Sequence, residues 1–417
     1  MRILKLTPAV EKKLLRDRQE RDREAERVAA DIIADVRKGG DAALAAYTKE
    51  FDGIDLRREG IWIAARETKA AAKHVSPEFT RALEHAARNV RRVARKQLPR
   101  PWSLKVEPGV TISNLIRPID SIGCYIPGGR FALVSTMVMT VVPARVAGVE
   151  NIVVLCPKPN AELLAAANIL GVEKIARIGG AQAIAALAYG TKSVARVDKI
   201  FGPGNRFVTA AKQLVSSDCA IDLPAGPTEA IVLAAKGDPQ FIAADLLAQA
   251  EHAPDAGSFL VTPSAKLAAA VQKEVATQLE KLPPGNPAHS SMRKTGAIML
   301  TSSLEAACAF TNRFAPEHLS LPDNSQALLK KITAAGTIFL GSWGAQPFGD
   351  YISGSNHVLP TGGWARMRAG LSAADFVKCI TVQNISARGF ANLANDTVTL
   401  ARSEGLLAHA NAVEVRR

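Results

Sequence analysis

The feature that most constrains the fold is a regular alternation of short aliphatic runs and Ala-rich helical segments. One cycle of this pattern covers residues 151–205, and a second covers residues 229–342. Alternation of this kind with short linkers predicts parallel sheets covered by helices on both faces. We therefore predict an α/β protein with two Rossmann-like parallel-sheet domains, an N-terminal helical arm and a C-terminal helical extension.

Outside the two cycles, three regions have patterns of their own. Residues 9–50 have helical periodicity that is interrupted at Gly39-Gly40, and Asp41 is the predicted N-cap of the helix that follows. Residues 109–129 alternate and are β-branched, which predicts strands closed by a Pro-Gly-Gly turn. From residue 364 onward, the sequence predicts helices to the end of the chain.

The composition excludes several classes of protein. The chain has 417 residues, of which 47% are hydrophobic, enough for a sizeable core. The net charge of +13 raises the question of nucleic acid, and basic residues concentrate in Arg91–Lys105. No zinc-finger or RRM module accompanies them, so we predict no nucleic-acid partner. A basic surface would equally attract an anionic dinucleotide cofactor.

Cysteine usage and hydropathy indicate the compartment. The five cysteines are scattered without a CxxC pair, which predicts no disulfide framework and favours a reducing compartment. Charged residues follow too soon after Met1 for a signal peptide, and no apolar run is as long as a membrane span. We expect a cytoplasmic protein without a membrane partner.

Three glycine-rich turns follow strands of the first cycle, at residues 125–130, 178–183 and 201–212. Small residues at strand ends let backbone N–H groups approach a phosphate at a helix N-terminus. None of the three is a GxGxxG fingerprint, and each alone is more typical of an ordinary strand-to-helix turn. Together they leave a nucleotide cofactor and a purely structural role about equally open.

Two groups of residues in the second cycle bear on catalysis or metal binding. Gln249 and His252 lie one turn apart at a predicted helix end, and Asp245 would extend the same face. This pattern suits a metal site, although a His capping helix carbonyls explains it as well. Glu317 and His318 are adjacent after a proline. In a loop both would reach a cleft as proton acceptors; a helix start with its acidic residue is the alternative.

Two further groups lie near the C-terminus. Asp350 and His357 belong to the loop "GDYISGSNHVLPTGG". Glu404 and His409 are five residues apart, which places them on different faces of one helix, so one or both would serve a site elsewhere. Four of the seven histidines therefore lie beside acidic or amide residues. That concentration predicts a His/carboxylate site for a divalent metal such as zinc or manganese.

Taken together and in this order, the motifs resemble those of the histidinol dehydrogenase family. The similarity runs from about residue 110 to the C-terminus, with a weaker match in the N-terminal helices. The matching stretches are "YIPGG", "GGAQAIAALAYGT", "FGPGNRFVTAAK", "DLPAGPTEAIVLA", "AQAEH", "RFAPEHL", "GDYISGSNHVLPTGG" and "EGLLAHANAVEVR".

The resemblance implies roles for individual residues. The implied acid–base pair is Glu317 and His318. The implied zinc ligands are Gln249, His252, Asp350 and, from the partner subunit, His409. The implied NAD contacts are Tyr125, Gln182 and Asn205. The implied substrate-binding residues are Thr228, Gln249, His252, His318, Asp350, His357, Glu404 and His409.

The resemblance also implies the reaction. L-Histidinol would be oxidised through L-histidinal to L-histidine with two NAD⁺, the last step of histidine biosynthesis, by a homodimer with shared active sites. His318 would take the alcohol proton, and Glu317 would activate water for the second step. A cysteine nucleophile is a rival for that step, and Cys124 is the only candidate near a motif.

This chain departs from the family pattern at several positions. Thr228 stands where Ser is common, Ala253 where Asp is usual, and Gly257 where Gln is frequent. Arg366 and Arg368 lie in a segment that is often smaller and more polar, and an added arginine would favour an anionic substrate. The alternative function is therefore a paralogous zinc- and NAD-dependent dehydrogenase acting on another alcohol, such as a sulfonated propanediol.

We divide the chain accordingly. Residues 1–20 are the N-terminal helical arm. Residues 21–124 and 228–370 form a first, discontinuous Rossmann-like domain with the zinc-binding and catalytic residues. Residues 125–227 form the NAD-binding Rossmann-like domain, and residues 371–417 are a C-terminal helical dimerisation segment.

Overall fold

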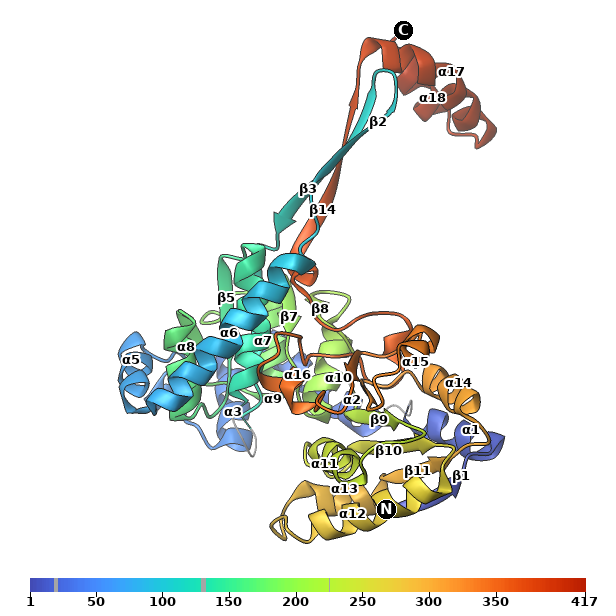
Figure 1. The fold of residues 1–417 in the computed structure, drawn as a ribbon. Coiled ribbons are helices and arrows are strands. Elements are labelled where there is room, and N and C mark those ends of the chain that lie inside the picture. Colours follow the sequence, from blue (N-terminus) through green and yellow to red (C-terminus); the bar gives the residue numbers. More distant parts are fainter. Residues whose placement is uncertain (19–21, 129–132, 225) are drawn as a thin grey trace.

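The computed structural model describes residues 1–18, 22–128, 133–224 and 226–417. Within these residues the chain forms a six-stranded sheet, a five-stranded sheet and a three-stranded sheet that projects from the rest of the molecule (Figure 1). The two larger sheets are parallel throughout, as the alternating pattern predicts. The α/β fold class is confirmed.

The six-stranded sheet has the order β1-β11-β10-β9-β12-β13. Its central strands are buried on both faces because helices cover each side. Helices α11, α12 and α13 cover one face, and α1, α14 and α15 cover the other. The strands are β1 (Arg2–Lys5), β9 (Glu229–Leu233), β10 (Gly257–Thr262), β11 (Ala297–Leu300), β12 (His318–Leu321) and β13 (Thr337–Leu340). The helices are α1 (Pro8–Asp17), α11 (Pro239–Ala250), α12 (Ala265–Leu279), α13 (Pro287–Lys294), α14 (Leu304–Phe314), α15 (Gln326–Lys331) and α16 (Pro347–Tyr351).

The five-stranded sheet has the order β6-β5-β4-β7-β8. Helices α6, α7 and α8 pack on one face, and α2, α9 and α10 pack on the other. The strands are β4 (Ser121–Tyr125), β5 (Asn151–Leu155), β6 (Lys174–Ala176), β7 (Lys199–Phe201) and β8 (Ala220–Ile221). The helices are α2 (Arg23–Gly39), α3 (Asp41–Asp52), α4 (Leu56–Glu59), α5 (Ala65–His74), α6 (Pro77–Gln97), α7 (Val134–Ala147), α8 (Ala161–Ile169), α9 (Gly180–Tyr189) and α10 (Arg206–Val215).

The N-terminal residues are distributed differently from the predicted division. Residues 2–5 form β1, which pairs with β11 at the edge of the six-stranded sheet. Helices α2 to α6 belong with the five-stranded sheet rather than with the six-stranded one (Figure 1). The reason is the apolar stripe of α2: Ile32, Ile33 and Val36 are buried in the same cluster as α9.

The predicted capping of α3 is also wrong. Its N-cap is Gly40, whose φ of 53° suits glycine, and Asp41 is the first helical residue. The Asp41 carboxylate instead accepts hydrogen bonds from the backbone N–H of Ser193 at 3.2 Å and from its hydroxyl at 2.7 Å. A tertiary contact thus replaces the expected local cap.

The three-stranded sheet is a long antiparallel arm that sequence patterns only partly predict. Its strands, in the order β14-β3-β2, are β2 (Trp102–Glu107), β3 (Val110–Pro118) and β14 (Val377–Ile385). The prediction of a helix through "AADFVKCI" is wrong, because only η2 (Ala373–Phe376) is helical there and β14 follows. The β-branched residues from 377 to 385 favour an extended strand, which pairs with β3 along its whole length.

Beyond the arm lies a hairpin of two helices, α17 (Ala387–Ser403) and α18 (Leu407–Glu414) (Figure 1). One short 3₁₀ helix, η1 (Trp364–Arg366), lies in the connection before η2. Of the Pro-Gly-Gly turn predicted after β4, the last glycine, residue 129, lies outside the described residues. In the described ranges, no helix is both long and apolar enough to cross a membrane.

Candidate active site

The candidate acid–base pair lies at the amino-terminal edge of the six-stranded sheet. Thr228 immediately precedes β9, and Glu317 immediately precedes β12. The parallel register pairs His318 with Ala230, so these strand starts are side by side. The alternative of a helix start is therefore wrong. A loop position holds for Glu317 but not for His318, which is the first residue of a buried strand.

The Glu317 carboxyl is buried and held at one oxygen. Its Oε2 accepts from the Thr228 hydroxyl and from the backbone N–H of Glu229, the latter at 3.0 Å. Burial nevertheless raises the pKa of Glu317 to about 8, because these two hydrogen bonds do not offset the loss of solvation. At neutral pH this group is largely protonated and can both give and accept a proton.

The His318 imidazole is buried and neutral. Burial, together with the neighbouring His252, lowers the pKa of His318 to about 3. Among the described residues, neither ring nitrogen has a hydrogen bond of good geometry, although the Glu229 backbone interacts with the ring and opposes this shift. Its Nδ1 is 3.7 Å from Glu317 Oε2, and its Nε2 is 3.8 Å from Asp350 Oδ1. Because the ring is neutral, these are contacts across a small gap and not ion pairs. An unpartnered buried imidazole of this kind is available to a substrate.

Asp350 lies between two imidazoles. It comes from the short helix α16, and its carboxylate is also 3.9 Å from Nε2 of His252, which follows the C-cap of α11. Burial raises the pKa of Asp350, and the nearby His252 opposes that shift. Gln249, the third member of this group, donates to the Thr228 hydroxyl at 2.7 Å and accepts from Gln346 at 2.6 Å.

Asp245 was predicted to extend the helix face that carries Gln249 and His252, but its hydrogen bond is made to another segment. It lies one turn before Gln249 on α11, and burial raises its pKa to about 6, opposed by a backbone hydrogen bond from Gln346. Its partner is therefore the segment before α16, and Gln346 bridges Asp245 and Gln249.

His357 joins the two parallel sheets. Its Nδ1 is 2.9 Å from the backbone oxygen of Asp350, and its Nε2 is 3.2 Å from the Thr136 hydroxyl in the first turn of α7. Burial lowers the pKa of His357 to about 4. The loop that carries it needs glycine at Gly354, where φ is 101° and a Cβ would lie 2.8 Å from the Asn89 oxygen of α6. The irregular backbone of this loop therefore fits closely against α6.

The donors around Asp350 fit a divalent metal that also has a ligand from elsewhere. In the parts of the chain described, no group of three or more His, Cys, Asp or Glu side chains is placed to hold a metal. Of the predicted zinc ligands near Asp350 in this chain, only His252 and Asp350 itself are His, Cys, Asp or Glu residues. Their separation of 3.9 Å is too long for a hydrogen bond, so neither group satisfies the other. The Gln249 carbonyl has a second lone pair to add.

The predicted cofactor contacts lie at the carboxyl-terminal edge of the five-stranded sheet. Tyr125 ends β4, and its buried hydroxyl accepts from the Gly180 N–H at 3.2 Å at the start of α9. Asn205 caps α10 after β7 and accepts from two backbone N–H groups. Gln182 is fully buried, yet neither polar atom of its side chain has a hydrogen-bond partner in the described ranges. Unsatisfied buried amides are costly, so a bound polar group would fit there.

Glu404 and His409 are not brought to this cluster within the chain. Both are exposed residues of the α17–α18 hairpin, which Figure 1 shows at the far end of the arm from α16. The expectation that these residues serve a site on another copy of the chain is consistent with this placement.

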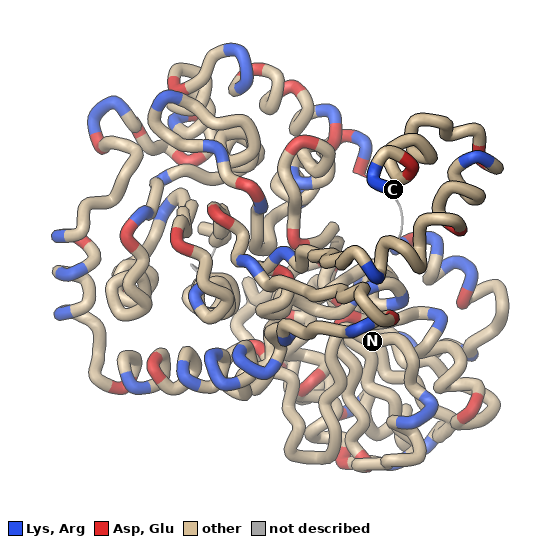
Figure 2. The backbone as a smooth tube through the Cα atoms, turned by 90° about the horizontal axis from the view of Figure 1, so that it is seen from above, with Lys and Arg blue, Asp and Glu red and all other residues tan. Residues whose placement is uncertain are grey.

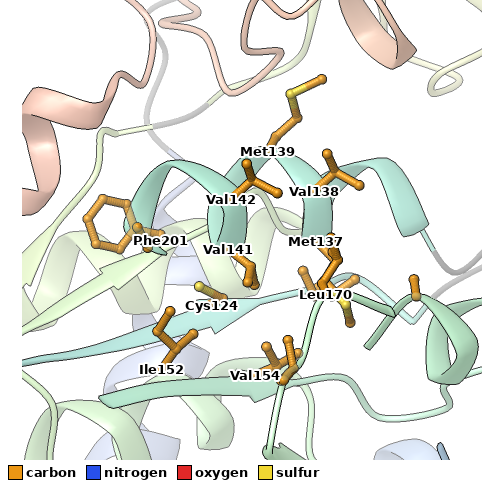
Figure 3. Packing of buried hydrophobic residues seen from close by; sticks show 14 of the residues in the cluster. Cys124, Met137, Val138, Met139, Val141, Val142, Ile152, Val154, Leu170 and Phe201 are labelled. Carbon is orange, nitrogen blue, oxygen red and sulfur yellow. The ribbon is translucent and has the colours of Figure 1, made fainter. Parts of the chain in front are cut away.

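The structure does not favour Cys124 as a nucleophile for the second oxidation. Cys124 is fully buried in the middle of β4 among aliphatic side chains of α7 and β5 (Figure 3). Burial raises the pKa of its thiol to about 12, so a thiolate is not available at working pH.

Of the two arginines after the glycine-rich loop, Arg368 is engaged by a backbone oxygen and a carboxylate outside the site. Arg368 donates to the Asp222 backbone oxygen and lies 3.6 Å from the Asp375 carboxylate. Arg366 is exposed in η1. The net positive charge is likewise spread over the outer segments, with Asp and Glu between the basic residues (Figure 2).

Sequence reasoning missed several residues that complete the site. Thr136, Gln346 and Glu229 contact predicted residues through long-range packing that no local pattern encodes. Arg18 in turn contacts Glu229. Only Glu229 carried a signal, because it lies next to Thr228 in a recognised motif.

The fold and the site together define an α/β enzyme, with acid–base groups at the edge of one parallel sheet and glycine-rich turns at the edge of the other. A protein-family model described as histidinol dehydrogenase matches residues 15–417. The chain therefore belongs to the histidinol dehydrogenase family of NAD-dependent oxidoreductases. The resemblance inferred from the motifs is confirmed.

Individual members of the family are similar to this chain over nearly its whole length. Histidinol dehydrogenase from Methanothermobacter thermautotrophicus is 47% identical, covering 93% of this chain and 92% of its own length. That from Vibrio parahaemolyticus is 46% identical, with 93% and 90% covered. The crystal structure of histidinol dehydrogenase from Elizabethkingia anophelis superimposes with a TM-score of 0.93 at 37% identity, covering 100% of this chain and 98% of that one.

Proposed function

We propose that the protein oxidises L-histidinol through L-histidinal to L-histidine. One water and two NAD⁺ are consumed, and two NADH and three protons are released with the carboxylate. The observation that carries the proposal is the buried Glu317–His318 pair beside Asp350 and His252. Membership of the histidinol dehydrogenase family supports the choice of alcohol.

In the first oxidation, His318 takes the hydroxyl proton of the alcohol while the adjacent carbon loses hydride. The neutral imidazole has a free nitrogen for this purpose. Because the pKa of His318 is only about 3, the ring does not keep the proton. The Glu317 carboxylate, 3.7 Å away and with a pKa of about 8, is the acceptor to which the proton passes.

In the second oxidation, Glu317 activates the water that hydrates the aldehyde. The Thr228 hydroxyl and the Glu229 N–H keep its Oε2 in place, which leaves Oε1 to accept a proton from water. The hydrate then has an alcohol-like O–H, and His318 repeats its first role.

Zinc would be held by Gln249, His252, Asp350 and His409 of a second copy, and when bound it would polarise and orient the substrate amine and imidazole. NAD⁺ would be held by Tyr125, Gln182 and Asn205 and would accept the hydride. His357 and Glu404 would line the substrate pocket together with these groups.

The proposal includes a homodimer in which the α17–α18 hairpin of each chain completes the site of the other. Both hairpin residues of the predicted site lie far from Asp350 within one chain (Figure 1). The hairpin exposes Leu400, Leu406 and Leu407, and an exposed aromatic group lies beside α16. That group consists of Phe241, Trp343, Phe348 and Tyr351. Exposed apolar surface of this kind is typical of a subunit interface. The cytoplasm remains the predicted compartment, in keeping with five free cysteines.

The substitution Glu317→Gln tests the assigned roles. It keeps the shape of the side chain but removes the proton acceptor, so aldehyde oxidation is expected to fall by about 10²–10⁴-fold. Alcohol oxidation falls by less, because His318 remains. NADH formation is measured separately from histidinol and from histidinal. If the variant lost alcohol oxidation but kept aldehyde oxidation, the division of roles would be wrong.

A further inference from the structure

Arg18 and Glu229 form a buried ion pair that the proposed chemistry does not use. Arg18 follows α1, and Glu229 is the first residue of β9 at the same sheet edge as Glu317. Their side chains are only 10% and 6% exposed. A buried pair of this kind is seldom a net source of stability, because both groups lose their solvation. Its position beside the acid–base residues points to a function in the site.

Glu229 and Glu317 hold each other through reciprocal backbone contacts. The Glu229 N–H donates to Glu317 Oε2 at 3.0 Å, and the Glu317 N–H hydrogen-bonds to the Glu229 carboxyl. The Gly362 N–H, from the glycine-rich loop after His357, also hydrogen-bonds to the Glu229 carboxyl. A displacement of Glu229 would therefore move the Glu317 carboxyl and loosen this loop together.

Arg18 holds the segment that leads into Glu317 from the other side. One guanidinium nitrogen donates to the backbone oxygen of Phe314, and the guanidinium carbon lies 3.7 Å from the centre of the Phe314 ring. Between Phe314 and Glu317, Ala315 has a φ of 50°, a conformation that side chains other than glycine rarely adopt. Such a backbone persists where the surrounding contacts fix it. Arg18 supplies such contacts.

We propose that Arg18 and Glu229 are positioning residues that fix the Glu317 carboxyl for proton transfer, an inference that rests on the proposed role of Glu317. Arg18 acts on Glu317 indirectly, through its contacts with Phe314 and Glu229. Glu229 acts directly, because its backbone N–H holds the Glu317 carboxyl. Neither side chain has to touch the substrate.

The charged groups around Glu317 make the pH dependence of activity a test of the proposal that is separate from protein stability. The titratable and charged groups facing it are Glu229 from β9, Asp350 from α16 and the adjacent His318, with Arg18 behind Glu229. Glu229→Gln removes a negative charge beside Glu317 and leaves the Arg18 cation behind it unpaired, and both changes favour the Glu317 carboxylate. The double variant Arg18→Gln/Glu229→Gln removes both charges and restores the balance.

The test is the pH dependence of NADH formation from histidinol with the full-length enzyme. Glu229→Gln is expected to move the rise in activity to lower pH by about one unit, and the double variant to return it toward the wild-type position. Arg18→Gln is expected to lower kcat by roughly tenfold, with KM within about twofold, because Glu317 is misplaced. Arg16→Gln is the matched control, because Arg16 is 74% exposed and its ion pair within the described residues is with the adjacent Asp17.

Circular dichroism and thermal unfolding show whether each variant is folded. If Arg18→Gln does not fold, the conservative Arg18→Lys and the single Glu229→Gln still decide the question. A folded Glu229→Gln enzyme with the wild-type pH profile would overturn the inference, as would equal losses in the Arg18 and Arg16 variants. The proposed function fails separately, if the wild-type enzyme forms no NADH from histidinol.

Discussion

At the scale of single residues, the site depends on two neighbouring groups, Glu317 and His318. Burial shifts their pKa values in opposite directions. The pKa of Glu317 is raised to about 8, and that of His318 is lowered to about 3. Both shifts favour the neutral form, which is the less costly one without solvent. The result is an uncharged pair at neutral pH, with a proton on the carboxyl and a free imidazole beside it.

The raised pKa of Glu317 predicts how activity depends on pH. The base form of a carboxyl whose pKa is about 8 is scarce at pH 7 and predominates by pH 9. Steady-state histidine formation at saturating histidinol and NAD⁺ is therefore expected to rise across this interval, by about tenfold per unit below the pKa. The residual activity of Glu317→Gln is expected to show no such rise. A wild-type profile that is flat from pH 7 to 9 would contradict the assignment of Glu317 as the base.

The residues that sequence patterns made candidates are those with a local signature. Gln249 and His252 share a helix end, and Glu317 and His318 are adjacent, so spacing alone made them candidates. Arg18 had no such signature, because its contact with Glu229 joins residues 211 positions apart. The pKa directions were also beyond reach, because they follow from burial that only the packed structure defines.

At the scale of elements, the two parallel sheets contribute opposite edges to the site. The six-stranded sheet presents the amino-terminal ends of β9 and β12, whereas the five-stranded sheet presents the carboxyl-terminal ends of β4 and β7. His357 and Thr136 link the loop after α16 to the start of α7 across this junction. The alternation of strands and helices predicted both sheets, but it could not predict which edges would meet.

The three-stranded arm was the element least accessible to prediction. The segment 377–385 lies between helical patterns, and its strand character depends on pairing with β3, more than 250 residues earlier. Its burial pattern is exposed along most of its length, so hydrophobic alternation gave little signal.

The base of the arm offers a test of element packing. Phe376, which directly precedes β14, is fully buried and stacks on Phe201 of β7 with ring centres 4.1 Å apart. Phe376→Ala is expected to lower the free energy of unfolding by about 3–5 kcal/mol, because it leaves a cavity where the arm joins the sheet. Chemical denaturation measures this loss. Phe51→Ala, at a position that is 51% exposed, is the control and should cost about 1 kcal/mol or less. A loss at Phe376 no larger than at Phe51 would contradict this view of the anchor.

At the scale of the whole molecule, the arm separates the α17–α18 hairpin from the rest of the chain. Glu404 and His409 are on that hairpin, whereas Asp350 belongs to α16 and His252 follows α11. Figure 1 shows the hairpin at the far end of the arm from α16. A single chain therefore lacks two of its predicted site residues. We propose that a second copy of the chain supplies them.

Mixing of inactive variants tests this sharing of sites. Glu317→Gln and His409→Ala homodimers are each expected to have little activity. When their subunits are exchanged, one of the two sites in each heterodimer receives an intact Glu317 and an intact His409. Activity is then expected to recover to about a quarter of the wild-type value for a random mixture, since half the dimers are mixed and half their sites are intact. Absence of recovery, with mixed dimers verified by mass spectrometry, would contradict sharing.

We propose that one buried acid–base pair serves two successive oxidations of histidinol. The most direct measurement is the number of NADH molecules formed per histidinol consumed, with NAD⁺ in excess and the product identified by chromatography. We expect two NADH per histidinol, histidine as the product and no accumulation of the aldehyde. One NADH per histidinol with release of histidinal, or no NADH at all, would contradict the claim.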